Sequence, residues 1–306
     1  MLKRLIPVLV LVATPALAQT RATEGILLLA HGGAADWNER VAALARTVDQ
    51  TQPVEVAFGM ASRPAIQQAV DKLVARGVTS IVAVPLFVSS HSSVITSTAY
   101  LLGARAEMPP ELKIYAKMNH GGQGGAQGGS GHEGHTVADT SADNMRPVQS
   151  PVSIRMTDAL NRHEQVGAIL IDRARDISTV PAREAVIIVA HGPVPDDDNE
   201  RWLADMQVLA KQVAASTSFA ALDVLTLRDD APKPIRDAAT AQLRHLAQGH
   251  IAAGRRVLIV PLLISFGGIE RGLRERLEGL DYTMAKAALM PDDRLASWVL
   301  AMAGQH

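Results

Sequence analysis

The sequence contains no cysteine, so neither a disulfide nor a thiolate metal ligand is available to the chain. Any metal ion that it binds must be held by histidine, carboxylate or water ligands. The net charge is only −1, which gives no electrostatic reason to expect nucleic acid or an anionic membrane as a partner. Long apolar runs are also missing, because no stretch approaches the ~20 residues of a membrane-spanning helix. We therefore expect a protein held together by core packing, with no stable membrane insertion.

The amino-terminal 18 residues have the pattern of a secretory signal. A basic start at Lys3 and Arg4 precedes the apolar run 5–12, and Ala16-Leu17-Ala18 is typical of a cleavage site. The apolar run is too short for a transmembrane helix. We therefore expect residues 1–18 to be a signal peptide that is removed, and the mature chain to be periplasmic or secreted.

An internal repeat divides the remaining chain into two halves. Three segments recur in the same order, at 26–32 and 186–192, at 38–40 and 199–201, and at 80–89 and 256–265. The apolar runs are short, rich in Val, Ile and Leu, and separated by segments with helical spacing, which is typical of parallel strands covered by helices on both faces. We therefore predict an α/β fold of two similar doubly wound domains, residues 24–178 and 183–304, each with a parallel four-stranded sheet.

Residues 119–147 do not fit the repeat. This segment is rich in glycine and poor in large apolar residues, so it cannot bury enough surface to offset the entropy of ordering it. We predict a flexible insert within the first domain. It carries His120, His132 and His135, which either collect metal ions or belong to an inert linker, and the sequence leaves both readings open.

Histidines are predicted at the carboxyl ends of several strands. His31 and His191 each end an apolar run and precede glycine, and His91 lies in a serine-rich loop after the run that contains Pro85. Ligands of doubly wound domains bind outside the carboxyl ends of the strands, where a neutral imidazole can bind a divalent cation or accept a proton. We therefore predict a two-histidine site at His31 and His91. The alternative is that His31 caps a turn and His91 is a solvated loop residue.

The ordered set of segments resembles the class II tetrapyrrole chelatases, namely the sirohydrochlorin cobaltochelatases and ferrochelatases. The resemblance rests on the strand-His-Gly start, the Val-Pro-Leu-Phe strand with its histidine loop, and the helical segment 161–175. It implies two chelatase-like domains and a lyase of cobalamin or siroheme biosynthesis. Such an enzyme inserts Co²⁺, or alternatively Fe²⁺ or Ni²⁺, into sirohydrochlorin or a related tetrapyrrole without an organic cofactor. It also implies that His31 and His91 hold the metal and take up the pyrrole protons.

The sequence departs from this family pattern in both halves. Many members carry a carboxylate after the second strand, where this chain has Met60, and a thioether does not supply the missing charge. The second half has no equivalent of His91, so it resembles a degenerate copy with His191 and Glu270 as candidate helpers. Arg40 and Arg63 are candidates for binding substrate carboxylates, but a solvated surface role is favoured for both.

Two other functions remain open. The first is an exported metal-binding or metal-delivery protein that keeps the chelatase fold without turnover. It is favoured by the signal sequence, because the substrate of this family is made in the cytoplasm, and by Met60 and the histidine-rich insert. The second is a tetrapyrrole-binding protein without catalysis. The sequence predicts neither which metal is used nor the oligomeric state.

Overall fold

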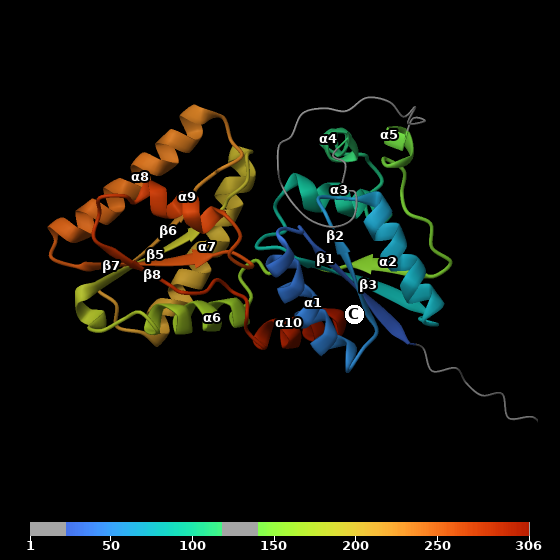
Figure 1. The fold of residues 1–306 in the computed structure, drawn as a ribbon, viewed down its shortest axis with the longest axis horizontal. Helices are drawn as coiled ribbons and strands as arrows, with labels where there is room; N and C mark the ends of the chain where they lie inside the picture. The colour runs from blue at the N-terminus through green and yellow to red at the C-terminus, as the bar shows by residue number, and fades with distance from the viewer. Residues whose placement is uncertain (1–22, 118–139, 306) are drawn as a thin grey trace, which may run out of the picture.

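The computed structural model describes residues 23–117 and 140–305, and they form two α/β units side by side (Figure 1). The strands are β1 (Glu24–Ala30), β2 (Val54–Phe58), β3 (Ser80–Leu86), β4 (Ser153–Met156), β5 (Glu184–Ala190), β6 (Ala221–Thr226), β7 (Arg256–Leu262) and β8 (Tyr282–Met284). They form two four-stranded sheets with the orders β2-β1-β3-β4 and β6-β5-β7-β8. Every neighbouring pair is parallel. The predicted fold class is therefore confirmed.

Helices alternate with the strands and cover both faces of each sheet. They are α1 (Ala35–Asp49), α2 (Arg63–Ala75), α3 (Ser93–Leu101), α4 (Leu112–Lys117), α5 (Thr140–Asp143), α6 (Glu164–Arg175), α7 (Asp196–Ser216), α8 (Lys233–Ala252), α9 (Ile269–Arg276) and α10 (Arg294–Ala303), with a short 3₁₀ turn at Pro181–Arg183. Alternate residues of β1 enter two separate cores, which explains why the strand is apolar on both faces. Among the described residues, no helix has the length and apolar character needed to cross a membrane.

The repeat seen in the sequence is also a repeat of register. Ala30 at the end of β1 lies opposite Phe58 and Leu86, and Ala190 at the end of β5 lies opposite Thr226 and Leu262. The glycine that follows each histidine has a left-handed backbone, with φ of +82° at Gly32 and +78° at Gly192. Glycine adopts this conformation without strain. The His-Gly pair is therefore the point at which each inner strand turns toward its helix.

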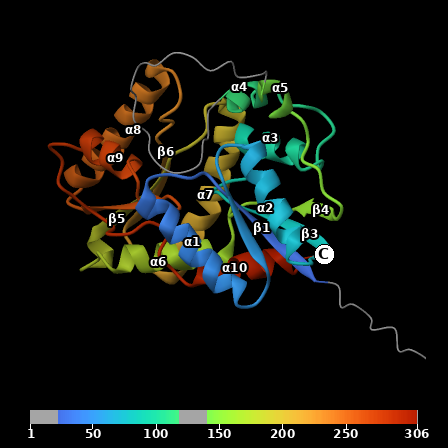
Figure 2. The same cartoon turned by 45° about the vertical axis from the view of Figure 1, so that its right-hand side comes forward.

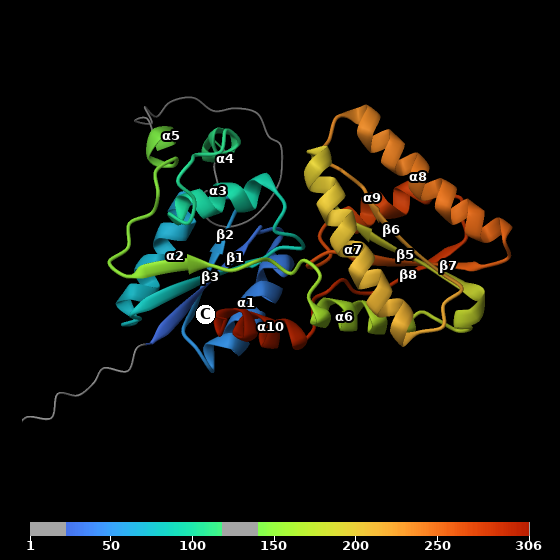
Figure 3. The same cartoon turned by 180° about the vertical axis from the view of Figure 1, so that it is seen from behind.

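Each half of the chain gives its last helix to the sheet of the other half. Helix α6 packs against α7 and β7, whereas α10 packs against α1 and β3 (Figure 3). We call β1–β4 with α1–α5 and α10 the first lobe, and β5–β8 with α6–α9 the second lobe. The predicted boundaries at 178 and 183 follow the sequence repeat and stay a prediction. The packing shows in addition that the two lobes exchange these helices.

Arginines hold the exchanged helices in place. Arg173 on α6 donates hydrogen bonds to the carbonyl oxygens of Ala288, Leu289 and Pro291, in the segment that leads to α10. Arg155 on β4 donates to the carbonyl oxygen of Ala303 at the end of α10. One apolar core runs from the face of the first sheet to that of the second. The two lobes are therefore interlocked rather than joined by a single linker.

Several predicted features fall wholly or partly outside the described residues. These are the signal peptide at residues 1–18 and the insert histidines His120, His132 and His135. The predicted insert 119–147 is described from residue 140 onward, where it forms α5. After α5, the carbonyl oxygen of Arg146 accepts a hydrogen bond from Arg63 on α2.

Candidate functional site

The two candidate histidines of the first lobe lie at the same edge of one sheet. His31 directly follows β1, and His91 lies in the loop between β3 and α3. Strands β1 and β3 are parallel neighbours with Ala30 opposite Leu86, so both histidines follow carboxyl ends of adjacent strands. His31 is exposed and His91 is half-buried. The topology thus brings them to the edge where α/β sheets bind ligands, and their joint binding of one ion stays a prediction.

The backbone of the glycine turn orients the ring of His31. Its Nδ1 lies 2.5 Å from the carbonyl oxygen of Gly32. Because a carbonyl can only accept, Nδ1 carries the proton and Nε2 keeps its lone pair in the neutral ring. Asn38 secures the turn by accepting from the Gly33 amide at 2.8 Å and donating to the Gly33 carbonyl at 3.1 Å. Nε2 of His31 is therefore the nitrogen available to a metal ion or a proton.

His91 is held by residues of both lobes. Its amide donates to Ser89 Oγ at 3.1 Å, and its carbonyl accepts from Nε1 of Trp202 on α7 at 2.6 Å. Its ring Nε2 lies 3.9 Å from Oδ2 of Asp205, also on α7. Figures 1 and 2 show α1 and α7 toward the middle of the molecule, where the lobes meet. Sequence reasoning missed Trp202 and Asp205, because no local pattern indicates what this helix faces.

The surroundings of His91 are acidic. Burial, followed by the charge of Asp197, raises the pKa of Asp198 in the first turn of α7, while Arg201 and His91 act in the opposite direction. In the first lobe, by contrast, Met60 is half-buried and packs against an apolar core. The negative charges near His91 thus include carboxylates of the second lobe rather than a residue at position 60.

The residues described do not form a closed metal site. Across 23–117 and 140–305, no three His, Asp or Glu side chains gather closely enough to hold an ion. A catalytic site differs from a structural one in keeping coordination positions open for water or substrate. The described residues at the edge of the first sheet therefore include two imidazoles, and the further ligands of an ion held there would be water or substrate.

The two arginines suggested for substrate carboxylates occupy different places. Arg40 on α1 donates to Oγ of Ser265 in the second lobe at 2.9 Å and lies 3.7 Å from Asp36. Close by, Trp37 borders Gly267, where an added Cβ would be 3.4 Å from the indole. Arg40 therefore joins the lobes near the histidine edge. Arg63 lies elsewhere, on α2, and donates to the Arg146 carbonyl.

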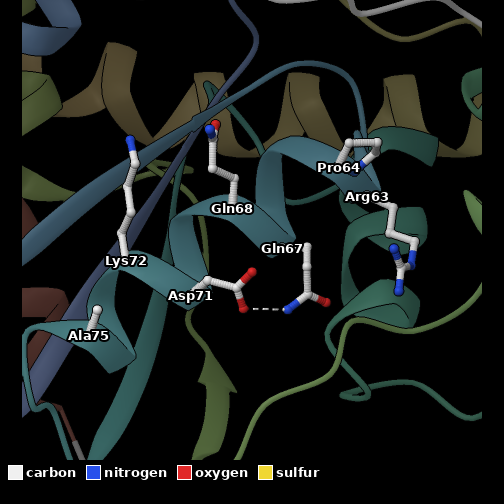
Figure 4. A pocket seen from close by; sticks show the side chains of 7 residues that line it. All are labelled: Arg63, Pro64, Gln67, Gln68, Asp71, Lys72 and Ala75. Atoms are coloured by element: carbon white, nitrogen blue, oxygen red, sulfur yellow. Dashed lines mark hydrogen bonds between the residues drawn. The ribbon is translucent and has the colours of Figure 1, made fainter.

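A surface groove of about 550 Å³ runs along the outer face of α2 (Figure 4). It is lined by Arg63, Pro64, Gln67, Gln68, Asp71, Lys72 and Ala75. Gln67 donates to Asp71 and to the Gln149 carbonyl, each at 2.8 Å, which ties α2 to the chain after α5. The groove contains no histidine and is open to solvent. It does not belong to the site at the carboxyl edge.

The second lobe fills the corresponding edge with its own side chains. The amide of Leu227 donates to the Ala190 carbonyl, just as the amide of Gly59 donates to the Ala30 carbonyl. The next residue, Arg228, therefore occupies the position that Met60 has in the first lobe. The guanidinium of Arg228 donates to the carbonyls of Pro193 and Val194 in the turn after His191. It also lies 2.6 Å from Asp196, and its side chain is 11% exposed. An arginine thus occupies this loop with a fixed positive charge.

The two candidate helpers of the second lobe already have partners. His191 Nε2 lies 3.4 Å from Oδ2 of Asp230. Glu270 accepts hydrogen bonds from the amides of Gly267 and Gly268 at 2.9 and 2.8 Å. Burial raises the pKa of Glu270, but these hydrogen bonds outweigh burial and leave the pKa below its ordinary value. Glu270 therefore closes its own loop.

Comparison with known proteins identifies the family. The CbiX family model matches residues 25–177, which is half of the chain and contains both His31 and His91. The structure of SirB from Bacillus subtilis with Fe³⁺ superposes with a TM-score of 0.57 at 17% sequence identity, covering 92% of this chain and 94% of that one. This likeness shows the fold.

A second similar structure is DR2241 from Deinococcus radiodurans, described as a multi-domain protein with structural similarity to chelatases. It superposes with a TM-score of 0.49 at 17% identity, covering 93% of this chain and 55% of that one. No curated protein matches the chain. On the family match and the fold together, the chain belongs to the CbiX family of class II chelatases, which insert metal ions into tetrapyrroles.

Proposed function

We propose that the chain inserts a divalent metal ion into sirohydrochlorin or a related tetrapyrrole, with Co²⁺ as the metal and Fe²⁺ or Ni²⁺ as alternatives. The observation that carries the proposal is the placement of His31 and His91 at the carboxyl ends of adjacent parallel strands. Both lie in the part of the chain that the family model matches. Imidazole nitrogen suits these borderline metals.

The two histidines have complementary roles in this proposal. The metal enters as substrate and replaces two pyrrole protons, so the reaction needs ligands that release the ion and bases that accept protons. His31 presents a free Nε2 because its Nδ1 is bonded to Gly32. His91 is half-buried at the boundary of the lobes. Neutral imidazoles can perform both tasks in turn, first as ligands and then as proton acceptors.

Conversion of sirohydrochlorin by the purified protein with Co²⁺ tests the proposal through the ultraviolet–visible spectrum of the macrocycle. We expect His31→Ala and His91→Ala each to lower the insertion rate by roughly 10²–10⁴-fold, the range typical of a general base. His245→Ala is the matched control, because His245 is exposed on α8 of the second lobe. Wild-type rates in both test variants would contradict the proposal.

An exported metal-binding or metal-delivery protein is the second candidate. It is favoured by Met60, which packs against an apolar core and brings no charge to the site. This candidate predicts tight Co²⁺, Ni²⁺ or Zn²⁺ binding without conversion of the macrocycle. Deletion of residues 120–135 separates the insert from the site, because unchanged metal uptake would make that segment a linker.

We also propose that the mature protein is periplasmic or secreted and begins at Gln19. The support is the signal pattern of residues 1–18. Cell fractionation combined with the intact mass of the recovered protein tests it. A full-length mass in the cytoplasmic fraction would contradict both the cleavage and the location.

A further inference from the structure

We propose that Asp205, on helix α7 of the second lobe, is a positioning residue for His91 of the first lobe. The inference rests on the proposed function, in which the imidazole of His91 binds the metal ion. It gives the second lobe a part in the reaction, although Arg228 occupies the carboxyl edge of that lobe's own sheet. The carboxylate acts on the ring of His91 and does not itself bind the ion.

The first support is the state of the Asp205 carboxylate. Its side chain is 13% exposed, and Oδ2 lies 3.9 Å from His91 Nε2. Oδ2 is buried and has no hydrogen-bond partner among the described residues, while Oδ1 lies 3.8 Å from Arg162. A buried carboxylate oxygen without a partner is costly. A shift of about 1 Å between ring and carboxylate brings Nε2–H into hydrogen-bond range.

The second support is that the same helix also forms a hydrogen bond with the backbone of His91. Trp202 precedes Asp205 by three residues, which places both on one face of α7. The indole of Trp202 is 8% exposed, and its Nε1 donates to the His91 carbonyl at 2.6 Å. Helix α7 therefore contacts the histidine at its main chain and at its ring. The position of the ring depends on how the two lobes are packed together.

The consequence for chemistry is a defined tautomer. When Nε2–H points toward the Asp205 carboxylate, the neutral ring of His91 has its lone pair at Nδ1. Metal-binding histidines ordinarily donate their second N–H to a carboxylate or carbonyl, which orients the ring. His31 follows the same rule with the Gly32 carbonyl at Nδ1. Because Asp205 Oδ2 is shielded from solvent, it acts through the imidazole and does not reach an ion held beside a macrocycle.

Asp205→Asn tests this role with nearly unchanged side-chain volume. In protein labelled with ¹⁵N-histidine, two-bond ¹H–¹⁵N correlations report the tautomer of each ring, and the His91 signal is identified by its loss in His91→Ala. We expect the Nε2–H form in the wild type and a mixture in Asp205→Asn, because an amide can accept or donate. We expect the Kd for Co²⁺ to rise by about 10–100-fold, the usual effect of losing such a partner.

Further variants separate positioning from folding. Glu200→Gln makes the same chemical change at an exposed site on α7 and is expected to leave the tautomer and the Co²⁺ affinity unchanged. Trp202→Phe removes the bond to the His91 carbonyl but keeps an aromatic ring in the core, and we expect weaker Co²⁺ binding in a folded protein. In turnover, Asp205→Asn should lower kcat while the KM for sirohydrochlorin stays constant.

An unchanged His91 tautomer together with wild-type Co²⁺ affinity in Asp205→Asn would overturn the inference. These two measurements need no macrocycle. If the wild-type protein fails to convert sirohydrochlorin, the proposed function fails, while the tautomer and the Co²⁺ affinity still decide the part played by Asp205.

Discussion

The strand-His-Gly turn occurs once in each lobe, but the two copies differ in what lies beyond it. In the first lobe, His31 is exposed and its Nε2 is free, and the neutral Met60 follows the neighbouring strand β2. In the second lobe, the guanidinium of Arg228 is bonded to the turn after His191. This guanidinium is paired with Asp196 at 2.6 Å, and Nε2 of His191 lies 3.4 Å from Asp230, so both side chains already have partners within the second lobe. A repeat can therefore keep its backbone geometry while the side chains beyond the turn differ between its two copies.

The second lobe nevertheless contacts the first lobe close to the candidate site. Its helix α7 contacts the His91 loop, and its Ser265 accepts a hydrogen bond from Arg40. One lobe thus presents the candidate ligands, and the other holds the loop on which one of them lies.

The largest expected difference is between His31 and His191, which occupy equivalent positions. We expect His31→Ala to reduce Co²⁺ insertion into sirohydrochlorin by roughly 10²–10⁴-fold and His191→Ala to leave the rate at the wild-type level. The reason is that Arg228 already fills the second turn. Insertion rates of the two variants, measured side by side, test this difference. Equal losses of rate would show that the carboxyl edges of both sheets take part in the reaction.

A second contrast lies at the opposite edge, where each inner strand begins with glutamate. Glu184 is 1% exposed. Burial raises its pKa, but hydrogen bonds from Ser178, Thr179 and Val180 outweigh burial and lower the pKa from 4.5 to about 2. Arg256 lies 2.9 Å away. Glu24, at the same position of the first lobe, is 21% exposed and pairs with Arg155 at 3.0 Å.

We expect Glu184→Gln to lower the free energy of unfolding at pH 7 by about 3 kcal/mol, and Glu24→Gln by about 1 kcal/mol. Because the folded pKa of Glu184 is depressed, its contribution is complete above pH 4.5 and is lost as the pH falls toward 2. Urea unfolding of both variants at pH 7 and pH 3 measures this. Two results would contradict the depressed pKa of Glu184. One is an equal loss of stability in both variants at pH 7, and the other is a stability difference between Glu184→Gln and the wild type that is as large at pH 3 as at pH 7.

A last substitution makes the second turn resemble the first and is expected to change stability but not the insertion rate. Arg228→Met copies Met60 and removes the hydrogen bonds to Pro193 and Val194. We expect a loss of about 1–3 kcal/mol of stability, because two carbonyls lose their partners. Thermal unfolding measures the change, and the insertion rate should stay at the wild-type level. A marked fall in that rate would show that Arg228 serves the first lobe.

Much of each lobe could be predicted because its signals are local. The apolar run 26–30 predicts a strand buried on both faces, and Gly32 follows it where the backbone turns left-handed. Helix α6 marks the limit of such reasoning. Its buried residues Val166, Ile169 and Leu170 indicate an apolar face, but the spacing does not reveal that the face covers the second sheet rather than the first.

The amino-acid sequence alone determined the two parallel sheets, the turn after each inner strand and the candidacy of His31 and His91, because strand burial and turn geometry depend on residues close together in the chain. Only the tertiary structure decided that α6 and α10 change places and that Arg228 fills the second edge. It also decided that Asp205 faces His91. These contacts join residues far apart along the chain, and which of them form depends on how whole apolar faces pack together.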